Sequence, residues 1–302
     1  MVLSPAAVGA RPGTTYLPPY AGTSSSVSQS LSSNCGSAGG HAAHWKSTNG
    51  QVIGASKVAI HSCPWWFGQP GASSQHSVIV AIPVHPSLIS LYNVSESWSW
   101  KVVTAMALSS PSSCHAAINY TSGYDYEDCY WYADWYAYAQ STLWDTSTNT
   151  MVSTTYNEWA LENYTENYVD NYCYYGTCSS GSGSFSGSSA GNYAAQGTGY
   201  DYSYTYLGSG TTTGTASLWT NTSNYYVNNT LTPTHKYALI TTWVFEAYAY
   251  FYAYQYAFDG TNYYYNSYAA PGPATASASV AALPSSGTSG GITVTSVVLT
   301  AV

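Results

Sequence analysis

The chain has 302 residues, of which only 18 are charged and 33 are tyrosine, whereas about 25% of the residues in an ordinary soluble domain are charged. Aromatic residues make up 16% of the chain, which excludes a wholly disordered protein. Five scattered lysines and arginines cannot neutralise a run of phosphates, so we exclude nucleic acid as a partner.

The few charges are unevenly distributed. Residues 1–122 have a net charge of +3, whereas residues 123–202 hold ten carboxylates and no lysine or arginine. Two interpretations remain open: an acidic solvated face, or attraction between the basic and acidic regions of neighbouring subunits. Because acid unfolding mostly protonates carboxylates that are paired in the native state, this composition predicts stability in acid.

The first half of the chain predicts an arm followed by strands. Residues 1–50 are rich in Gly, Ser, Pro and Ala, which indicates an extended N-terminal arm or loop. Residues 51–122 contain short apolar runs separated by Pro and Gly, and these are typical of a first β region. No segment shows convincing helical periodicity, and no run of 18 apolar residues predicts a membrane span.

Residues 123–268 form a tyrosine-rich β region in which tyrosines alternate with small or apolar residues. In residues 247–258, tyrosines occupy one face and alanines dominate the other; tyrosines alternate in the same way in residues 130–138 and 200–206. The predicted fold is therefore all-β, an antiparallel β-sandwich of the jelly-roll or Ig-like kind, with long tyrosine-rich strands and extended termini.

The C-terminal part predicts a tether and a terminal strand. Residues 269–291 have little to bury and are typical of a flexible linker. Residues 292–302 are uncharged and β-branched, so they need a sheet to join. The strand either folds back onto its own domain or completes the sheet of the next subunit. For the second case, the interface residues are Ile292, Val294, Val297, Val298, Leu299 and Val302.

Two covalent features suggest an exported protein. The six cysteines contain no Cys-x-x-Cys pair, which favours disulfides; of the fifteen possible connectivities we favour pairing of neighbours, Cys35 with Cys63, Cys114 with Cys129 and Cys173 with Cys178. Five Asn-x-Ser/Thr sequences, at Asn93, Asn119, Asn163, Asn221 and Asn228, permit glycosylation. Both features are compatible with an extracellular, cell-surface location.

Three motifs resemble catalytic or metal-binding sites, but a structural interpretation fits each of them better. Ser189 lies in a Gly-x-Ser-x-Gly sequence, but a Gly/Ser-rich loop is not the strand–turn–helix context of a nucleophile elbow. His41 and His44 are too few for a zinc site. The acidic segment 125–128 lacks an EF-hand pattern and is interpreted as an exposed acidic turn. We therefore predict no metal and no cofactor.

One segment resembles an enzyme family. Residues 157–162, Asn-Glu-Trp-Ala-Leu-Glu, are similar to the Glu-Trp segment of the glutamic peptidases, which are acid-active β-sandwich enzymes that use a Gln/Glu pair. The resemblance carries over one residue, Glu158, and the sequence offers no companion Gln segment. It implies an acid-active hydrolase as an alternative function.

The composition and the terminal strand resemble those of secreted filament subunits, namely threads and strand-donating pili, and of other cell-surface proteins of thermoacidophilic archaea. This resemblance implies a structural subunit, not an enzyme, that polymerises with copies of itself through strand donation and tyrosine-rich contacts. The alternatives are a virion coat protein, the acid-active hydrolase, and a carbohydrate-binding β-sandwich whose tyrosines stack on sugars.

Overall fold

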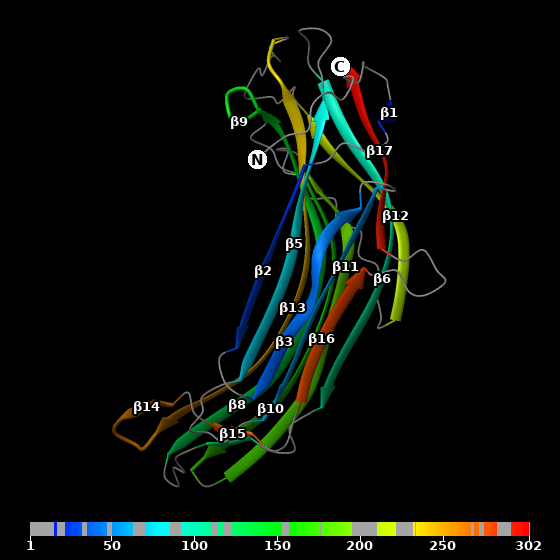
Figure 1. The fold of residues 1–302 in the computed structure, drawn as a ribbon. Coiled ribbons are helices and arrows are strands. Elements are labelled where there is room, and N and C mark those ends of the chain that lie inside the picture. Colours follow the sequence, from blue (N-terminus) through cyan, green and yellow to red (C-terminus); the bar gives the residue numbers. More distant parts are fainter. Residues whose placement is uncertain are drawn as a thin grey trace.

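The structure, a computed structural model, describes residues 15–16, 22–31, 35–46, 50–62, 70–84, 92–109, 114–116, 123–152, 157–175, 177–194, 210–221, 232, 234–266, 269–271, 275–282 and 291–301. Within these ranges the chain is built from strands and turns and contains no helix (Figure 1). The strands are β1 (Thr15–Tyr16), β2 (Gly22–Leu31), β3 (Gly36–Lys46), β4 (Gln51–His61), β5 (Gly71–Val84), β6 (Tyr92–Ser109), β7 (Cys114–Ala116), β8 (Tyr124–Asp145), β9 (Thr150–Met151), β10 (Asn157–Tyr174), β11 (Thr177–Ala194), β12 (Gly210–Asn221), β13 (Tyr237–Phe258), β14 (Tyr263–Asn266), β15 (Ala269–Pro271), β16 (Thr275–Ala282) and β17 (Gly291–Ala301).

Two antiparallel sheets make up the sandwich. Sheet A has seven strands in the order β1-β17-β4-β16-β6-β12, with β3 paired to β4. Sheet B has eight strands in the order β11-β10-β8-β13-β5-β2, with β9 and β14 paired to the ends of β8 and β13. The short strands β7 and β15 form a separate pair. The predicted all-β antiparallel sandwich with long tyrosine-rich strands is confirmed.

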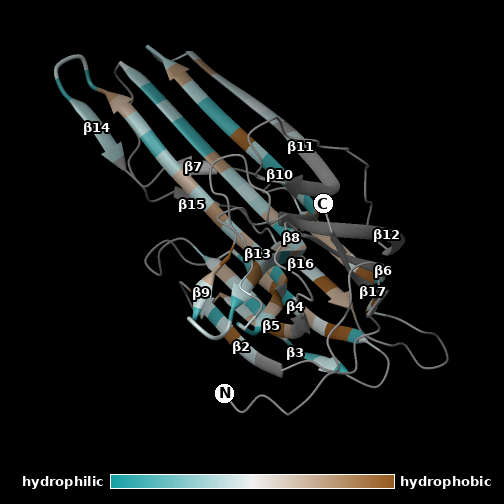
Figure 2. Cartoon of the chain, turned by 90° about the horizontal axis from the view of Figure 1, so that it is seen from above, coloured by the Kyte–Doolittle hydropathy of each residue, from teal (hydrophilic) through white to brown (hydrophobic). Residues whose placement is uncertain are grey.

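The alternation along β8 and β13 separates a buried face from a tyrosine face, and it appears as stripes of hydropathy in Figure 2. On the inner face, Trp131, Trp135 and the alanines from Ala247 to Ala257 are fully buried. The tyrosines between them point away from sheet A and are mostly half-buried. Both predicted tyrosine rows on these strands are confirmed; the row at 200–206 lies outside the described residues.

Small residues let the two sheets approach each other. Ala276, Ala278 and Val280 of β16 are buried among the alanines and tryptophans of β8 and β13. On β4, Gly54 leaves room for the ring of Phe245, because a Cβ at this position would collide with that ring. At this contact, β8 and β13 of sheet B supply the large rings, and β4 and β16 of sheet A supply short side chains that fit against them.

Two segments that the sequence predicted to lack regular structure are strands. In the predicted N-terminal arm (1–50), β2 pairs with β5 and β3 pairs with β4. In the predicted linker (269–291), β16 lies between β4 and β6. Both predictions were wrong for the same reason: Ser, Gly and Ala have low strand propensity, but backbone pairing with long neighbours overrides it.

The C-terminal strand folds onto its own chain. β17 runs antiparallel beside β6, and its other edge contacts β4 and β1. Ile292 and Val294 are buried in the core of the same molecule. In the single chain, this strand thus folds back onto its own domain, which was one of the two predicted alternatives. Removing residues 292–302 would therefore open sheet A itself.

The predicted division of the chain into residues 51–122 and 123–268 does not separate the sheets. β5 from the first region lies in sheet B beside β13, whereas β12 from the second lies in sheet A beside β6. Within the described ranges, no helix is long and apolar enough to cross a membrane.

A candidate active site on the concave face of sheet B

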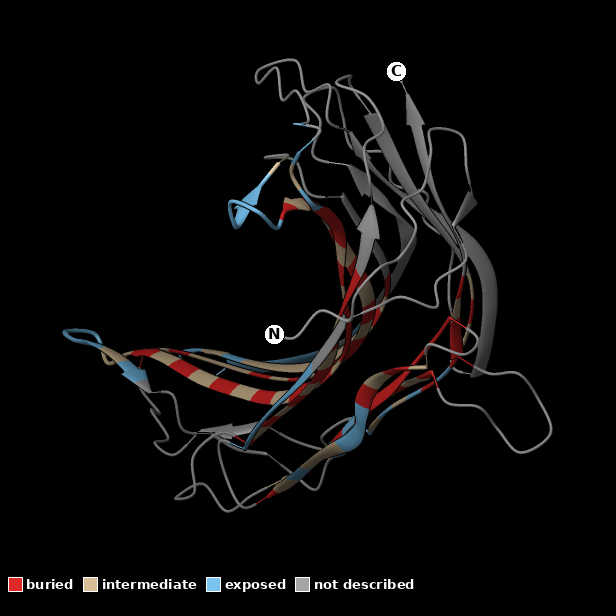
Figure 3. Cartoon of the chain, turned by 45° about the horizontal axis from the view of Figure 1, so that its top comes forward, coloured by how far each residue is buried: buried red, intermediate tan, exposed pale blue. Residues whose placement is uncertain are grey.

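Sheet B is strongly curved, and the face that it turns away from sheet A is the concave one (Figure 3). Figure 3 shows its long strands bent into an arc, with sheet A against the convex side and the exposed β9 and β14 hairpins at the two ends. The face turned away from sheet A is called the concave face. On the four strands that carry the candidate site, it includes Gln75 of β5; Tyr124, Tyr126, Asp128, Tyr130, Tyr132, Asp134, Tyr136 and Tyr138 of β8; Glu162, Tyr164, Glu166, Tyr168, Asp170, Tyr172 and Tyr174 of β10; and Glu246, Tyr248, Tyr250, Tyr252, Tyr254 and Tyr256 of β13.

Four polar residues form one row across the concave face. Gln75 of β5 lies directly opposite Glu246 of β13, which lies opposite Tyr136 of β8, which lies opposite Glu162 of β10. Directly opposite side chains on paired strands are within contact distance. The antiparallel register therefore brings an amide, two carboxyl groups and a phenol together from four separate segments of the sequence.

Gln75 and Glu246 interact directly. The Gln75 Nε2 atom donates to Glu246 Oε2 over 3.3 Å and to Tyr138 Oη over 3.4 Å. Both hydrogen bonds are long, so a substrate oxygen can compete for the amide N–H groups. Burial raises the pKa of Glu246 above its ordinary value, and the bond from Gln75 only partly opposes this. Glu246 therefore changes protonation state at a higher pH than an exposed glutamate.

Asp134 lies one row away from this pair, opposite Tyr248. It is 5% exposed, and burial raises its pKa to about 7 although the hydroxyls of Tyr132 and Tyr136 hydrogen-bond to it. The charge of Glu246 also raises this pKa. In acid, Asp134 is thus a neutral neighbour that adds no negative charge beside Glu246.

The one residue implied by the glutamic-peptidase resemblance, Glu158, lies in β10 directly opposite Gln140 of β8. The described residues do not include the Glu158 side chain. Gln140 was not recognised as a companion in the sequence, because the two residues are separated by a hairpin. The pair whose contact the structure shows is Gln75–Glu246, which sequence reasoning missed altogether.

The other sequence motifs have structural positions. Ser189 lies in strand β11 opposite Glu162, not in a loop or an elbow. The acidic segment 125–128 lies inside β8, so the prediction of an exposed acidic turn was wrong. Asp125 is buried and accepts a 2.8 Å hydrogen bond from Gln255. The His41 and His44 rings of β3 lie 5.6 Å apart.

The predicted covalent sites have mixed outcomes. Cys173 and Cys178 form the predicted disulfide across the β10–β11 hairpin, and Cys35 and Cys129 are also disulfide-bonded. Cys63 and the side chain of Cys114 lie outside the described residues, so the pairing of these four stays a prediction.

Asn163 is 2% exposed in the core side of β10, which makes it unsuitable for a bulky glycan and corrects that prediction. The side chains of the other four predicted glycosylation sites, Asn93, Asn119, Asn221 and Asn228, lie outside the described residues, as do those of the predicted interface residues Val297, Val298, Leu299 and Val302.

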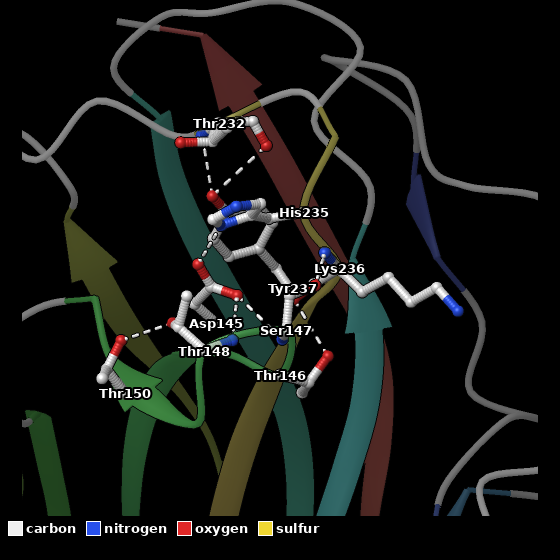
Figure 4. Close-up of polar contacts among 9 residues, drawn as sticks. All are labelled: Asp145, Thr146, Ser147, Thr148, Thr150, Thr232, His235, Lys236 and Tyr237. Carbon is white, nitrogen blue, oxygen red and sulfur yellow. Dashed lines mark hydrogen bonds and ion pairs between the residues drawn. The ribbon is translucent and has the colours of Figure 1, made fainter.

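A polar cluster stabilises the end of sheet B at which β9 lies (Figure 4). Asp145, the last residue of β8, accepts hydrogen bonds from the backbone N–H groups of Ser147 (2.9 Å) and Thr148 (3.2 Å). Its other oxygen lies 2.6 Å from His235 Nδ1. The cluster therefore fastens the β8–β9 turn to the segment that leads into β13.

We expect Asp145→Ala to reduce the free energy of unfolding by about 1–3 kcal/mol, because the buried carboxyl group loses its contact with half-buried His235 and its two hydrogen bonds from the turn. Burial tends to raise the pKa of Asp145, but His235 and the two N–H groups outweigh it and lower the pKa. The stabilisation is thus present above the pKa of the unfolded chain and is lost as pH falls through the folded value. Denaturant unfolding across this acidic range measures both effects. Equal acid sensitivity in Asp145→Ala and wild type would contradict the expectation.

Comparison with protein-family models, with curated proteins and with solved structures gives no match. In the described part of the chain, no three His, Cys, Asp or Glu side chains are grouped so that they could hold a metal ion. The geometry of the concave face is therefore the feature of the molecule from which a function can be inferred.

Proposed function

We propose that the protein is an acid-active hydrolase of the peptidase type, with Glu246 as general base and acid and Gln75 as the group that binds the developing oxyanion. The observation that carries this proposal is the 3.3 Å contact between Gln75 and Glu246 on an open, curved sheet face. The sequence predicted an acid-active hydrolase as an alternative on the basis of Glu158; the present proposal keeps that class of function but assigns it to Gln75 and Glu246. The predictions of a non-enzymatic protein and of an extracellular location stay untested.

The chemistry of the pair is that of general acid–base hydrolysis. The Glu246 carboxylate takes a proton from a water molecule, whose oxygen attacks the carbonyl carbon of the scissile bond. The Gln75 amide donates to the carbonyl oxygen as it becomes an oxyanion. The protonated Glu246 then gives its proton to the leaving amine, and the carbon–nitrogen bond breaks. A glutamate with a raised pKa suits both roles in mild acid.

The direct test is incubation of the full chain with an unfolded protein at a series of pH values, with new N-termini read by mass spectrometry. We expect cleavage in acid that declines toward neutral pH, where Asp134 ionises and its negative charge opposes the oxyanion that forms beside it. Absence of cleavage at every acidic pH would overturn the proposal.

A second candidate function, self-association as a subunit of an extracellular filament or surface layer, is favoured by a separate observation. At the β14 end of sheet B, Tyr174, Tyr175, Tyr263 and Tyr265 are 54–80% exposed and lie in contact with further rings. Clustered exposed aromatic side chains are typical of interaction surfaces. Electron microscopy of the purified chain and of a Tyr263→Ser/Tyr265→Ser variant tests this; a monodisperse monomer for both would exclude it.

A further inference from the structure

We propose that the concave face is a binding track for an extended, basic polypeptide, which lies along the strands from the Gln75–Glu246 pair toward the β14 hairpin. This inference rests on the proposed function, because it names the class of substrate that the pair would receive. Three features of the face lead to it: the spacing of its tyrosines, the contacts that fix their rings, and its charge.

The tyrosines repeat at the spacing of an extended peptide. Tyr248, Tyr250 and Tyr252 follow Glu246 along β13, each two residues from the last. Side chains on one face of a strand recur every ~6.8 Å, and alternate side chains of a strand-like peptide have the same repeat. A peptide that lies along β13 therefore meets a tyrosine at each same-side position.

Neighbouring rings hold one another in place. The Tyr250 ring centroid lies 4.9 Å from that of Tyr132 and 5.2 Å from that of Tyr248, and Tyr252 lies 5.1 Å from Tyr130. Rings fixed by such contacts lose little further freedom when a ligand packs on them. The track is therefore formed before a ligand arrives.

The charge of sheet B selects a basic ligand. No strand of sheet B contains a lysine or an arginine, whereas ten of the 13 carboxylates of the chain lie on these strands. These ten are Asp125, Glu127, Asp128, Asp134, Asp145, Glu158, Glu162, Glu166, Asp170 and Glu246. Glu166 lies opposite Tyr132, in the middle of the track. Asp125, Glu127 and Asp145 lie on the other face of the sheet, and the carboxyl groups on the concave face would attract a cationic side chain of the ligand.

Two positions on the face have carboxyl groups suited to cations. Asp128 and Asp170 lie directly opposite each other on β8 and β10, and their side chains hydrogen-bond. Asp134, buried in the same face, has one oxygen, Oδ1, that accepts no hydrogen bond from the described residues. An ammonium or guanidinium group has donors for each of these oxygens.

The register sets where the basic side chain should be. Asp128 lies opposite Tyr254, which is eight residues beyond Glu246 on β13. Eight residues of extended chain span roughly 27 Å. A lysine or arginine about eight residues from the cleaved bond therefore reaches the Asp128–Asp170 pair when the peptide lies along the track.

The test uses the full chain with Glu246→Gln, which removes the proposed base and leaves the track. Fluorescence anisotropy in weakly alkaline buffer, in which Asp128 and Asp134, whose pKa values burial raises to about 7, are ionised, compares a labelled peptide of about 20 residues that contains lysines with the same peptide in which glutamine replaces lysine. We expect the lysine peptide to bind about tenfold more tightly, the effect of one charge-assisted hydrogen bond. Added salt should reduce this difference.

The matched variants locate the effect. Asp128→Asn/Asp170→Asn should remove most of the preference for the lysine peptide, whereas Glu127→Gln, on the opposite face of the same strand, should not. Equal binding of the two peptides, or an unchanged preference in the double variant, overturns the track. Cleavage by wild type without a preference for the lysine peptide would overturn the track but not the proposed hydrolase function. A preference for the lysine peptide without any cleavage would support the track and overturn the hydrolase function. If the chain associates with its own copies through this face instead, binding will fall as protein concentration rises.

Discussion

Replacement of Glu246 by glutamine is expected to slow acid-pH hydrolysis by about 10²- to 10⁴-fold, the usual contribution of a positioned general base. Glutamine has nearly the same shape and keeps an oxygen that can accept the bond from Gln75, but it cannot take a proton from water. The change should therefore act on turnover more than on substrate binding. The measurement is kcat and KM with an unfolded protein or a peptide substrate in acid.

Gln75→Ala is the companion variant, because it removes the proposed oxyanion donor and leaves the base. We expect it to lower turnover by about 10²- to 10³-fold. Near-ultraviolet circular dichroism, which reports the packing of the many tyrosines, checks that both variants retain the native fold. If either variant has wild-type turnover, the Gln75–Glu246 pair is not the catalytic pair.

Trp135→Ala is expected to destabilise the protein by about 3–5 kcal/mol, which is the usual cost of removing a large buried aromatic side chain. Trp135 is 0% exposed, and on its two sides it lies opposite Ala247 and Asn163. These neighbours are small or polar, so they cannot move in to fill the space that the indole leaves. Denaturant unfolding of the variant measures the loss.

Trp135→Phe is the control for this prediction. The Trp135 Nε1–H group is buried and has no hydrogen-bond partner among the described residues. Phenylalanine removes this unpaired donor and keeps most of the apolar volume, so the two effects partly cancel. We expect a much smaller loss than for alanine. Equal losses would show that the polar atom, not the volume, determines the stability at this site.

The fold class followed from one local signal, the alternation of tyrosine with alanine or tryptophan. In residues 247–258 this pattern is unbroken, and a period of two fixes both the strand and its buried face. The same signal failed for β2, β3 and β16, where Ser, Gly and Ala alternate with each other. Their buried positions are defined by larger neighbours on other strands, which a local pattern does not reveal.

The candidate site was beyond sequence reasoning for a related reason. Gln75 and Glu246 are 171 residues apart, and neither belongs to a recognisable motif. Their contact depends on the pairing of β5 with β13, and a shift of the register by one residue would place one of them on the buried face. The sequence showed that the region is acidic, but it did not show that many of its carboxyl groups lie on one concave surface.

The absence of basic residues from sheet B has a practical consequence for peptide mapping. Trypsin cleaves after lysine and arginine, and the chain has neither between Lys101 and Lys236. The whole of β8, β10, β11 and β12 would thus be released as one long fragment. Locating a modification or a crosslink on these strands requires digestion after aromatic residues, for which the many tyrosines provide closely spaced sites.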